Sequence, residues 1–463
     1  MSPSKSTQQH ECLRLPLVNG DLAKVEPPRI AFFGHFGLGN FGNESTLQAM
    51  LVNSQTLLPV IELSCICTGP ETVGLTYGIL AAPVRGTVNN PWEPGNPVVR
   101  LIRKAVIGIP REVCRWAGSV AALRGTKAFV VPGTGLLNDA FTLFNWGPYD
   151  MFRWTVAAKL CRCKIFFVSV GAGPLYSRAG RFFVKAALRL ADFRSYRDES
   201  SQMYLKSIGL RASCDPVYPD LAFSLLAAKR PHRDAKRRPR RVVGVGVMPY
   251  AGRYSVERPK DATYVAYLAC MAEFVEWLLG NGYDVRLLIG DVVDLPVKEE
   301  FRTLLKSRCA AYGEERIIDE PVASVEVLLS QIASTDFVVA TRFHNVLLSL
   351  LLNKPSIAIS FHHKCASLMS QMGLSEYCLD INSLKSEELI AKFRELEQNA
   401  ARLKPLIQEK VEDRRKALEE QYRIIFQTIF PGRPLPEGLG GEGWRASEGE
   451  IEETVCVEGE RTA

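Results

Sequence analysis

Short apolar runs alternate with helical stretches along most of this chain, and this alternation constrains the fold more than any other feature. The runs are four to eight residues long, as expected of buried strands. Such strands, each followed by a helix, are typical of a parallel, doubly wound sheet, so the sequence predicts an α/β protein. The expected strands are residues 29–34, 60–67, 128–131, 164–170, 193–196, 241–247, 284–289, 336–340 and 356–360.

One basic segment with two prolines interrupts the alternation and divides the chain into two domains. A chain of 463 residues is too long for one ordinary core and suits two domains of roughly 200 residues each. Two Rossmann-like halves joined by one linker resemble the GT-B architecture, in which the active site lies in the interdomain cleft. The predicted organisation is a disordered N-terminus (1–28), an N-terminal Rossmann-like domain (29–227), a basic linker (228–240), a C-terminal Rossmann-like domain (241–385), a helical segment (386–430) and a disordered tail (431–463).

Within the helical segment, Ser386 is the expected N-cap and Pro405 the expected break, because proline lacks the backbone N–H of a helix interior.

Glycine-rich turns follow three of the expected strands, at the end of the sheet where ligands of parallel sheets bind. Glycines let the backbone approach a ligand closely, and asparagine amides can bond sugar hydroxyls. The alternative is that these are structural turns, with asparagine capping the next helix. The candidate acceptor-binding or cleft-lining residues are Gly39, Asn40, Gly42, Asn43, Gly133, Gly135, Gly171 and Gly173.

The first turn also spells a dinucleotide-binding pattern, with Gly37, Gly39 and Gly42 at the required spacing and Glu62 twenty residues beyond the last glycine. Two details disfavour this interpretation. The helix is expected to begin only near Ser45, after the third glycine, and the acid lies early in its strand.

Four charged or titratable residues also follow expected strands. Arg197 can pair with a carboxylate or phosphate, or form a salt bridge with Asp198. Arg342 and His344 place a permanent cation and an imidazole together at a helix start; a satisfied structural pair is the alternative. Lys364 follows the next strand and adds a cation, or is a surface lysine.

The composition indicates neither a metal centre nor a nucleic-acid partner. The 12 cysteines lack a zinc-type arrangement, and Cys65/Cys67 and Cys161/Cys163 are interpreted as buried reduced thiols, with metal binding as the alternative. The net charge of +7 is too modest to indicate nucleic acid. Residues 1–28 lack the apolar stretch of a secretory signal, so we expect a cytoplasmic location.

Residues 85–127 contain eight basic and only two acidic residues, interleaved with apolar ones. This pattern is consistent with a peripheral contact to anionic lipid at the inner face of the membrane. Ordinary amphipathic helices with a solvated basic face are the alternative.

Taken together, these segments resemble the polysaccharide pyruvyltransferase family in order and spacing from about residue 29 to 385. Asn43 is a departure, because many members carry aspartate there, and it weakens any mechanism that uses a carboxylate at that position. The matching segments are Gly39-Asn40-x-Gly42-Asn43-Glu44, Gly133-x-Gly135-Leu136, Gly171-x-Gly173-Pro174, Tyr196-Arg197-Asp198, 218–223, Arg342-x-His344, Asn353-Lys354-Pro355 and Lys364.

The resemblance implies a GT-B-like fold and a pyruvyl ketal formed on two sugar hydroxyls, with phosphoenolpyruvate as co-substrate and no other cofactor. It implies that Arg197, Arg342 and His344 bind the donor and drive the reaction, with Arg342 and His344 as the catalytic residues. We predict Lys364 as a further donor-binding residue. We expect the acceptor, a saccharide or a lipid-linked precursor, on the side of the N-terminal domain and the donor on the side of the C-terminal domain.

Two other functions fit the sequence. A nucleotide-sugar glycosyltransferase can use the same architecture, and a non-catalytic polysaccharide-assembly protein can keep the fold. The intact Arg342-x-His344 pair argues against the second.

Overall fold

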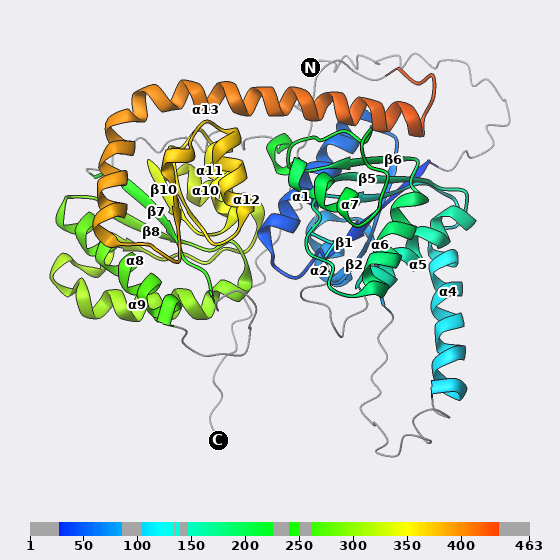
Figure 1. Cartoon of the computed structure of the whole chain (residues 1–463), viewed down its shortest axis with the longest axis horizontal. Coiled ribbons are helices and arrows are strands. Elements are labelled where there is room, and N and C mark those ends of the chain that lie inside the picture. The colour runs from blue at the N-terminus through cyan, green and yellow to red at the C-terminus, as the bar shows by residue number, and fades with distance from the viewer. Residues whose placement is uncertain are drawn as a thin grey trace, which may run out of the picture.

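The computed structural model describes residues 27–85, 104–133, 135–138, 147–225, 240–250 and 262–434. Two six-stranded sheets form two lobes (Figure 1). We call residues 27–225 the N-terminal lobe and residues 240–385 the C-terminal lobe. The expected disordered N-terminus, basic linker and disordered tail lie outside the described residues, except for a few residues at their inner ends.

The N-terminal lobe is built on a parallel sheet with helices on both of its faces. Its strands are β1 (Arg29–Gly34), β2 (Glu62–Cys67), β3 (Leu80–Pro83), β4 (Thr126–Pro132), β5 (Lys164–Val170) and β6 (Phe193–Tyr196). Its helices are α1 (Phe41–Leu57), α2 (Pro70–Tyr77), a π-helical turn (Lys104–Gly108), α4 (Ile109–Leu123), α5 (Gly147–Leu160), α6 (Arg178–Arg189), α7 (Glu199–Ser207) and η2 (Leu221–Ser224).

The C-terminal lobe repeats this plan. Its strands are β7 (Val242–Gly246), β8 (Asp284–Leu288), β9 (Ile317–Ile318), β10 (Phe337–Ala340), β11 (Ser356–Ser360) and β12 (Cys378–Asp380). Its helices are α8 (Ala262–Gly280), α9 (Leu295–Arg308), α10 (Val325–Ala333), α11 (Phe343–Leu351) and α12 (His363–Gln371), with short 3₁₀ segments η3 (Val292–Asp294), η4 (Ala310–Tyr312), η5 (Glu314–Arg316) and η6 (Ser375–Tyr377).

Both sheets have the strand order of a Rossmann fold, β3-β2-β1-β4-β5-β6 and β12-β11-β10-β7-β8-β9. All nine expected strands are present, with ends shifted by up to two residues, and every strand pair is parallel. The sequence missed β3, β9 and β12, which are two to four residues long and too short for a clear apolar run. The strand order reverses between β1 and β4 and between β7 and β10, so the turns after β1 and β10 lie where ligands of such sheets bind.

Helix α13 (Ser386–Ile429) turns a corner beside the C-terminal lobe and then runs across both lobes (Figure 1). The expected break at Pro405 is wrong, because the helix continues through it for 44 residues in all. Proline inside a helix is a common cause of such a kink. The expected N-cap is also wrong: Lys385 occupies that position, and the Ser386 hydroxyl donates instead to Glu273.

The far half of α13 is fastened to the N-terminal lobe by buried polar contacts. The Gln421 amide donates to Ser195 Oγ at 2.6 Å and accepts from Ser169 Oγ at 3.1 Å. The Tyr422 hydroxyl lies 2.9 Å from Ser224 Oγ. Buried hydrogen bonds of this kind are costly to break, so α13 holds the two lobes in one arrangement.

The start of α1 is a second junction between the lobes. The Phe41 backbone N–H donates to the Gly290 carbonyl at 3.1 Å, and Val292 N–H donates to the Gly39 carbonyl at 3.0 Å. Asn40 donates to Asp291 and also caps α1 by accepting from the Asn43 N–H. The helix therefore begins at Phe41 and not near Ser45, because Asn40 supplies the N-cap before the third glycine.

Among the described residues, α8 is the one helix long and apolar enough to cross a membrane. More than half of its most apolar stretch, 56%, is buried inside the protein. It is therefore packed as a core helix of the C-terminal lobe.

Replacing Asn40 by Ala should lower the free energy of unfolding by more than the loss of an ordinary N-cap, which is about 1 kcal/mol. The reason is that Asn40 both caps α1 and donates to Asp291 across the lobes. Chemical denaturation measures the effect. Ser324→Ala, which removes the cap of α10 within one lobe, is the matched control, and equal losses in the two variants would contradict the interlobe role.

Candidate active site

Side chains from both lobes converge on one buried carboxylate, Asp220, which is 3% exposed. Arg197 follows β6, and its Nη1 donates to Asp220 Oδ2 at 3.2 Å. His344 lies in the first turn of α11, and its Nε2 is 3.8 Å from the same oxygen. The guanidinium of Arg197 also lies over the ring of Phe343, 5.1 Å from its centroid. A guanidinium of one lobe and an imidazole of the other therefore meet between the lobes.

Two nitrogens of this cluster, Arg197 Nη2 and His344 Nε2, are buried without a hydrogen-bond partner among the described residues. Buried polar groups are nearly always paired, so an unpaired donor and an unpaired ring nitrogen on two side chains that meet at Asp220 indicate the place of a ligand.

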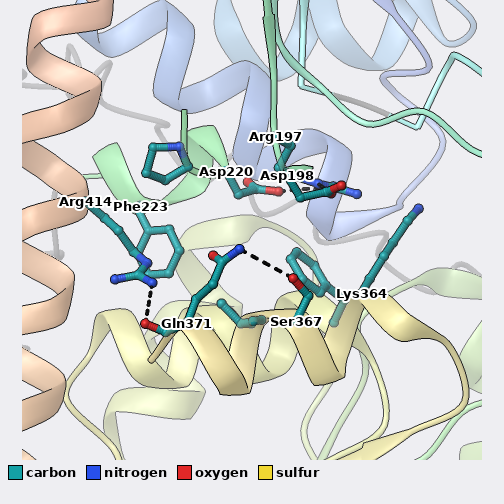
Figure 2. Close-up of a pocket in the computed structure, with 11 residues that line it drawn as sticks. Arg197, Asp198, Asp220, Phe223, Lys364, Ser367, Gln371 and Arg414 are labelled. Carbon is teal, nitrogen blue, oxygen red and sulfur yellow. Dashed lines mark hydrogen bonds and ion pairs between the residues drawn. The ribbon is translucent and has the colours of Figure 1, made fainter. Parts of the chain in front are cut away.

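Lys364 adds a second cation. It lies in the first turn of α12 and lines a pocket with Arg197, Asp220 and Phe223. Figure 2 shows residues of the N-terminal lobe on one side of this pocket and side chains of α12 on the other, with Arg414 of α13 at one end. The amino ends of α11 and α12 both lie at the cluster, where helix dipoles favour an anion. We call this the first pocket.

The charges of the cluster change one another's proton affinity. Burial is the main cause that lowers the pKa of His344 to about 4, with Arg197, Lys364 and Arg342 adding to it and Asp220 opposing it. Burial and then Arg197 lower the pKa of Lys364 to about 8. At neutral pH His344 is therefore neutral, while most of Lys364 keeps its charge.

Arg342 lies at the N-cap position of α11 but points back into its own lobe. Its guanidinium donates to both oxygens of Asp294, a carboxylate with no exposed surface. Asp294 also accepts from the backbone N–H groups of Gly290 and Asp291. Arg342 thus fastens the turn after β8, which contacts the start of α1; its role as a donor ligand stays a prediction.

Two of the predicted glycines make room for the cluster. A Cβ at Gly42 would lie 2.0 Å from His344 Nδ1, and a Cβ at Gly171 would lie 2.8 Å from Arg197 Nη2. Any side chain at Gly42 would therefore displace the imidazole, and one at Gly171 would crowd the guanidinium.

The other predicted acceptor residues lie in packed turns. Gly39 has φ +76°, and a Cβ there would be 2.4 Å from Val292 of the other lobe. A Cβ at Gly133 would contact Ser169 and Leu221, and one at Gly135 or Gly173 would contact Asn138. The Asn40 amide donates to Asp291, and the Asn43 amide donates to the His35 carbonyl. Acceptor binding by these residues stays a prediction.

The residue-by-residue prediction missed the acids that hold these groups. Asp220 and Asp294 have apolar neighbours in the sequence, and both are buried. Because a buried carboxylate needs a partner, an acid among apolar residues could have been predicted to pair with a cation. Glu44 is a third: it accepts from Gly37 N–H at 2.7 Å and shapes the first turn, and burial raises its pKa to about 7.

The two cysteine pairs singled out from the sequence lie outside this site. Cys65, Cys67 and Cys163 are buried and Cys161 is half-buried, and all four are free thiols. Among the described residues, no group of three or more His, Cys, Asp or Glu side chains is arranged to hold a metal ion.

Two facing Rossmann-type lobes with a cationic cluster between them define a GT-B-like α/β protein. Residues 85–363 match the polysaccharide pyruvyl transferase family. The chain belongs to that family, as its sequence resemblance predicted.

A curated relative and several solved structures are also similar. The amylovoran biosynthesis protein AmsJ of Erwinia amylovora is 33% identical over 78 residues, which span 15% of this chain and 19% of that protein. The UDP-GlcNAc 2-epimerase of Neisseria meningitidis, bound to UDP-GlcNAc, matches with a TM-score of 0.54 and 10% identity over 86% of this chain and 100% of its own. HepE of Anabaena, in complex with UDP and glucose, matches with a TM-score of 0.51 and 12% identity, over 86% of this chain and 98% of its own. At these identities the structures support the fold alone.

Replacing Asp220 by Asn should lower the pKa of His344 further below its value of about 4. Asp220 is the carboxylate whose negative charge opposes burial at this ring, so its loss disfavours the imidazolium. Nitrogen NMR of the histidine side chains, with His344→Asn to assign the signal, follows the titration. Asp380→Asn, an exposed acid elsewhere in the C-terminal lobe, should leave it unchanged; a rise in the Asp220 variant would refute the assignment.

Proposed function

We propose that this protein transfers the pyruvyl group of phosphoenolpyruvate onto two hydroxyls of a sugar in a surface polysaccharide or its lipid-linked precursor, forming a pyruvyl ketal. The observation that carries the proposal is the pair of buried nitrogens of Arg197 and His344 that lack a hydrogen-bond partner among the described residues, with Lys364 lining the same pocket as Arg197. Membership of the polysaccharide pyruvyl transferase family supports it. The reaction as proposed needs no cofactor besides this co-substrate.

The charges of the cluster suit a small anion that carries a phosphate and a carboxylate. Arg197 keeps one nitrogen free of partners after binding Asp220, and a guanidinium pairs well with either group. Lys364 approaches the same space from the other lobe. The space enclosed at present is small, about 30 Å³, so donor binding requires the Lys364 side chain to move aside.

The donor anion would in turn activate His344. Negative charge beside the ring favours the imidazolium and raises its pKa from about 4. The protonated ring can then give its proton to the alkene carbon of phosphoenolpyruvate, which leaves an oxocarbenium-like centre. The first sugar hydroxyl adds to that centre and returns its proton to the ring, and the second hydroxyl displaces phosphate, which leaves with the second proton.

A nucleotide-sugar glycosyltransferase is the second candidate. The solved structures of similar fold include proteins bound to UDP-GlcNAc or to UDP and glucose, which favours this activity on architecture alone. The family match favours pyruvyl transfer. Thermal shift with phosphoenolpyruvate against UDP-sugars, GDP-sugars and NAD separates the two, because a ligand stabilises the fold it binds.

We further propose that the protein works in the cytoplasm at the membrane surface. Figure 1 shows α4 projecting from the N-terminal lobe. The π-helical turn that precedes α4 exposes Val106 and Ile107, and the start of α4 exposes Ile109 and Val113, each at least 47% exposed. The basic residues Arg111 and Arg115 lie on the same helix. An exposed apolar end with basic neighbours suits an anionic bilayer that carries a lipid-linked acceptor.

Arg197→Ala and His344→Ala should each reduce phosphate release from phosphoenolpyruvate and a lipid-linked saccharide by about 100-fold or more, because both remove a group at the reacting centre. Arg342→Ala should also abolish release, and in addition lower the melting temperature, because the buried Asp294 loses its partner. Arg189→Ala, an exposed arginine on α6, is the control. Normal turnover in the Arg197 and His344 variants would remove them from the mechanism.

Flotation with vesicles should recover the protein with mixtures of phosphatidylcholine and phosphatidylglycerol, more at low salt than at high salt. The double variant Ile109→Ser, Val113→Ser should float much less, because it removes apolar surface from the end of α4. Leu75→Ser, at a residue 89% exposed on α2, is the matched control. Equal flotation of all three proteins, or none by the unaltered chain, would end the membrane proposal.

A further inference from the structure

A second pocket lies at the carboxyl ends of β11 and β12 in the C-terminal lobe. Its volume is about 720 Å³, far larger than that of the first pocket. Strand ends Ser360 and Asp380 border it, together with Tyr250 from the turn after β7 and residues of the start of α12. No residue of this pocket has a role in the proposed donor site.

One part of the second pocket is aromatic. Phe361, 38% exposed, meets Tyr250 edge to face with 6.1 Å between ring centroids. The imidazoles of His362 and His363 lie next to these rings, and the centroids of the two imidazoles are 4.0 Å apart. Exposed rings in a concave site offer flat apolar surface to a ligand.

Another part carries groups that bond hydroxyls. The Tyr250 hydroxyl donates to Asn382 Oδ1 at 3.0 Å, and the Asn382 amide donates to Asp380 Oδ1 at 2.8 Å. These contacts hold the amide and the carboxylate in fixed positions while both side chains remain exposed. A carboxylate is an acceptor for hydroxyl donors, and an amide can both donate and accept.

The charge of the second pocket disfavours an anion. None of the described residues that line it is lysine or arginine, and Asp380 is negative. Burial lowers the pKa of both His362 and His363, that of His362 to about 4, so both rings are neutral at pH 7. Among these described lining residues, a phosphate or a nucleotide diphosphate would meet no permanent cation.

The first turn of α12 separates the two pockets. His362 and His363 line the second pocket, and the next residue, Lys364, lines the first. His363 is also close enough to Arg197 and Asp198 for their charges to shift its pKa. A ligand in the second pocket would therefore lie within one helical turn of a donor held by Arg197 and Lys364.

We propose that the second pocket binds a pyranose ring of the acceptor saccharide, with Phe361 and Tyr250 against its apolar C–H face and Asp380 and Asn382 on its hydroxyls. This inference rests on the proposed pyruvyl transfer and moves the acceptor from the glycine turns of the N-terminal lobe to the C-terminal lobe. The first glycine turn is taken up by contacts between the lobes, since Gly39 packs on Val292 and Asn40 bonds Asp291.

Saturation-transfer NMR with a panel of methyl glycosides (galactoside, glucoside, mannoside and N-acetylglucosaminide) tests the pocket without requiring turnover. We expect at least one glycoside to bind the unaltered protein, and Phe361→Ala and Asp380→Ala to weaken that binding by about tenfold each, the loss expected for one stacking or hydrogen-bonding contact. Phe182→Ala, at a phenylalanine 60% exposed on α6, is the matched control. Melting temperatures check that each variant is folded.

Binding of phosphoenolpyruvate, measured by calorimetry on the same proteins, keeps the two proposals apart. It should be unchanged in the Phe361 and Asp380 variants and lost in Arg197→Ala. If the unaltered protein binds no glycoside, or binds it equally well in folded Phe361 and Asp380 variants, the second pocket is not the acceptor site. If UDP or GDP loses affinity in those variants while glycosides do not, the pocket is a nucleotide site. Failure of phosphoenolpyruvate to bind the unaltered protein contradicts the proposed function instead.

Discussion

The close approach of α1 to the C-terminal lobe is the constraint on which the rest of this structure depends. The helix starts so near α11 that a single added carbon at Gly42 would overlap the His344 ring. The backbone of Phe41 bonds Gly290, and α13 ties the lobes together on another side. Because these contacts fix the lobes, the imidazole of His344 and the guanidinium of Arg197 approach the same carboxylate, Asp220.

Buried acids make that meeting of charges possible. Asp220 partly neutralises Arg197, and Asp294 neutralises Arg342. A buried cation without such a partner is costly, so each arginine is held in place by its acid. The two acids leave different amounts of charge available: Arg342 is committed to Asp294, whereas Arg197 keeps one nitrogen unpaired beside the imidazole. The site therefore pairs one arginine held by a buried acid of its own lobe with one that faces the space between the lobes.

The start of α12 organises the C-terminal lobe around this site. Its first turn presents Lys364 to the cationic cluster, while His363 and the N-cap residue His362 line a larger pocket with no lysine or arginine among its described lining residues. A cationic compartment and a partly aromatic one that carries Asp380 are thus separated by a single turn of helix. This arrangement suits a reaction between a small anion and an uncharged sugar. Arg197 and Lys364 attract the anion to the first pocket, and Asp380 repels it from the second.

The sequence by itself determined the repeated α/β plan, the nine longer strands and the turns that carry Arg197, Arg342, His344 and Lys364, because strand period, glycine content and polar residues after strands are local signals. The family could be predicted from the order of those turns. Local signals also misled: Pro405 reads as a helix end, yet contacts of α13 with both lobes outweigh the one lost hydrogen bond. Only the tertiary structure decided that Arg342 pairs with Asp294. It also decided that Arg197 and His344 both approach Asp220. The contacts of Gly39 and Asn40 with the other lobe are likewise tertiary. These are contacts between residues far apart in the chain, and no local pattern encodes which of several acids a buried arginine will meet.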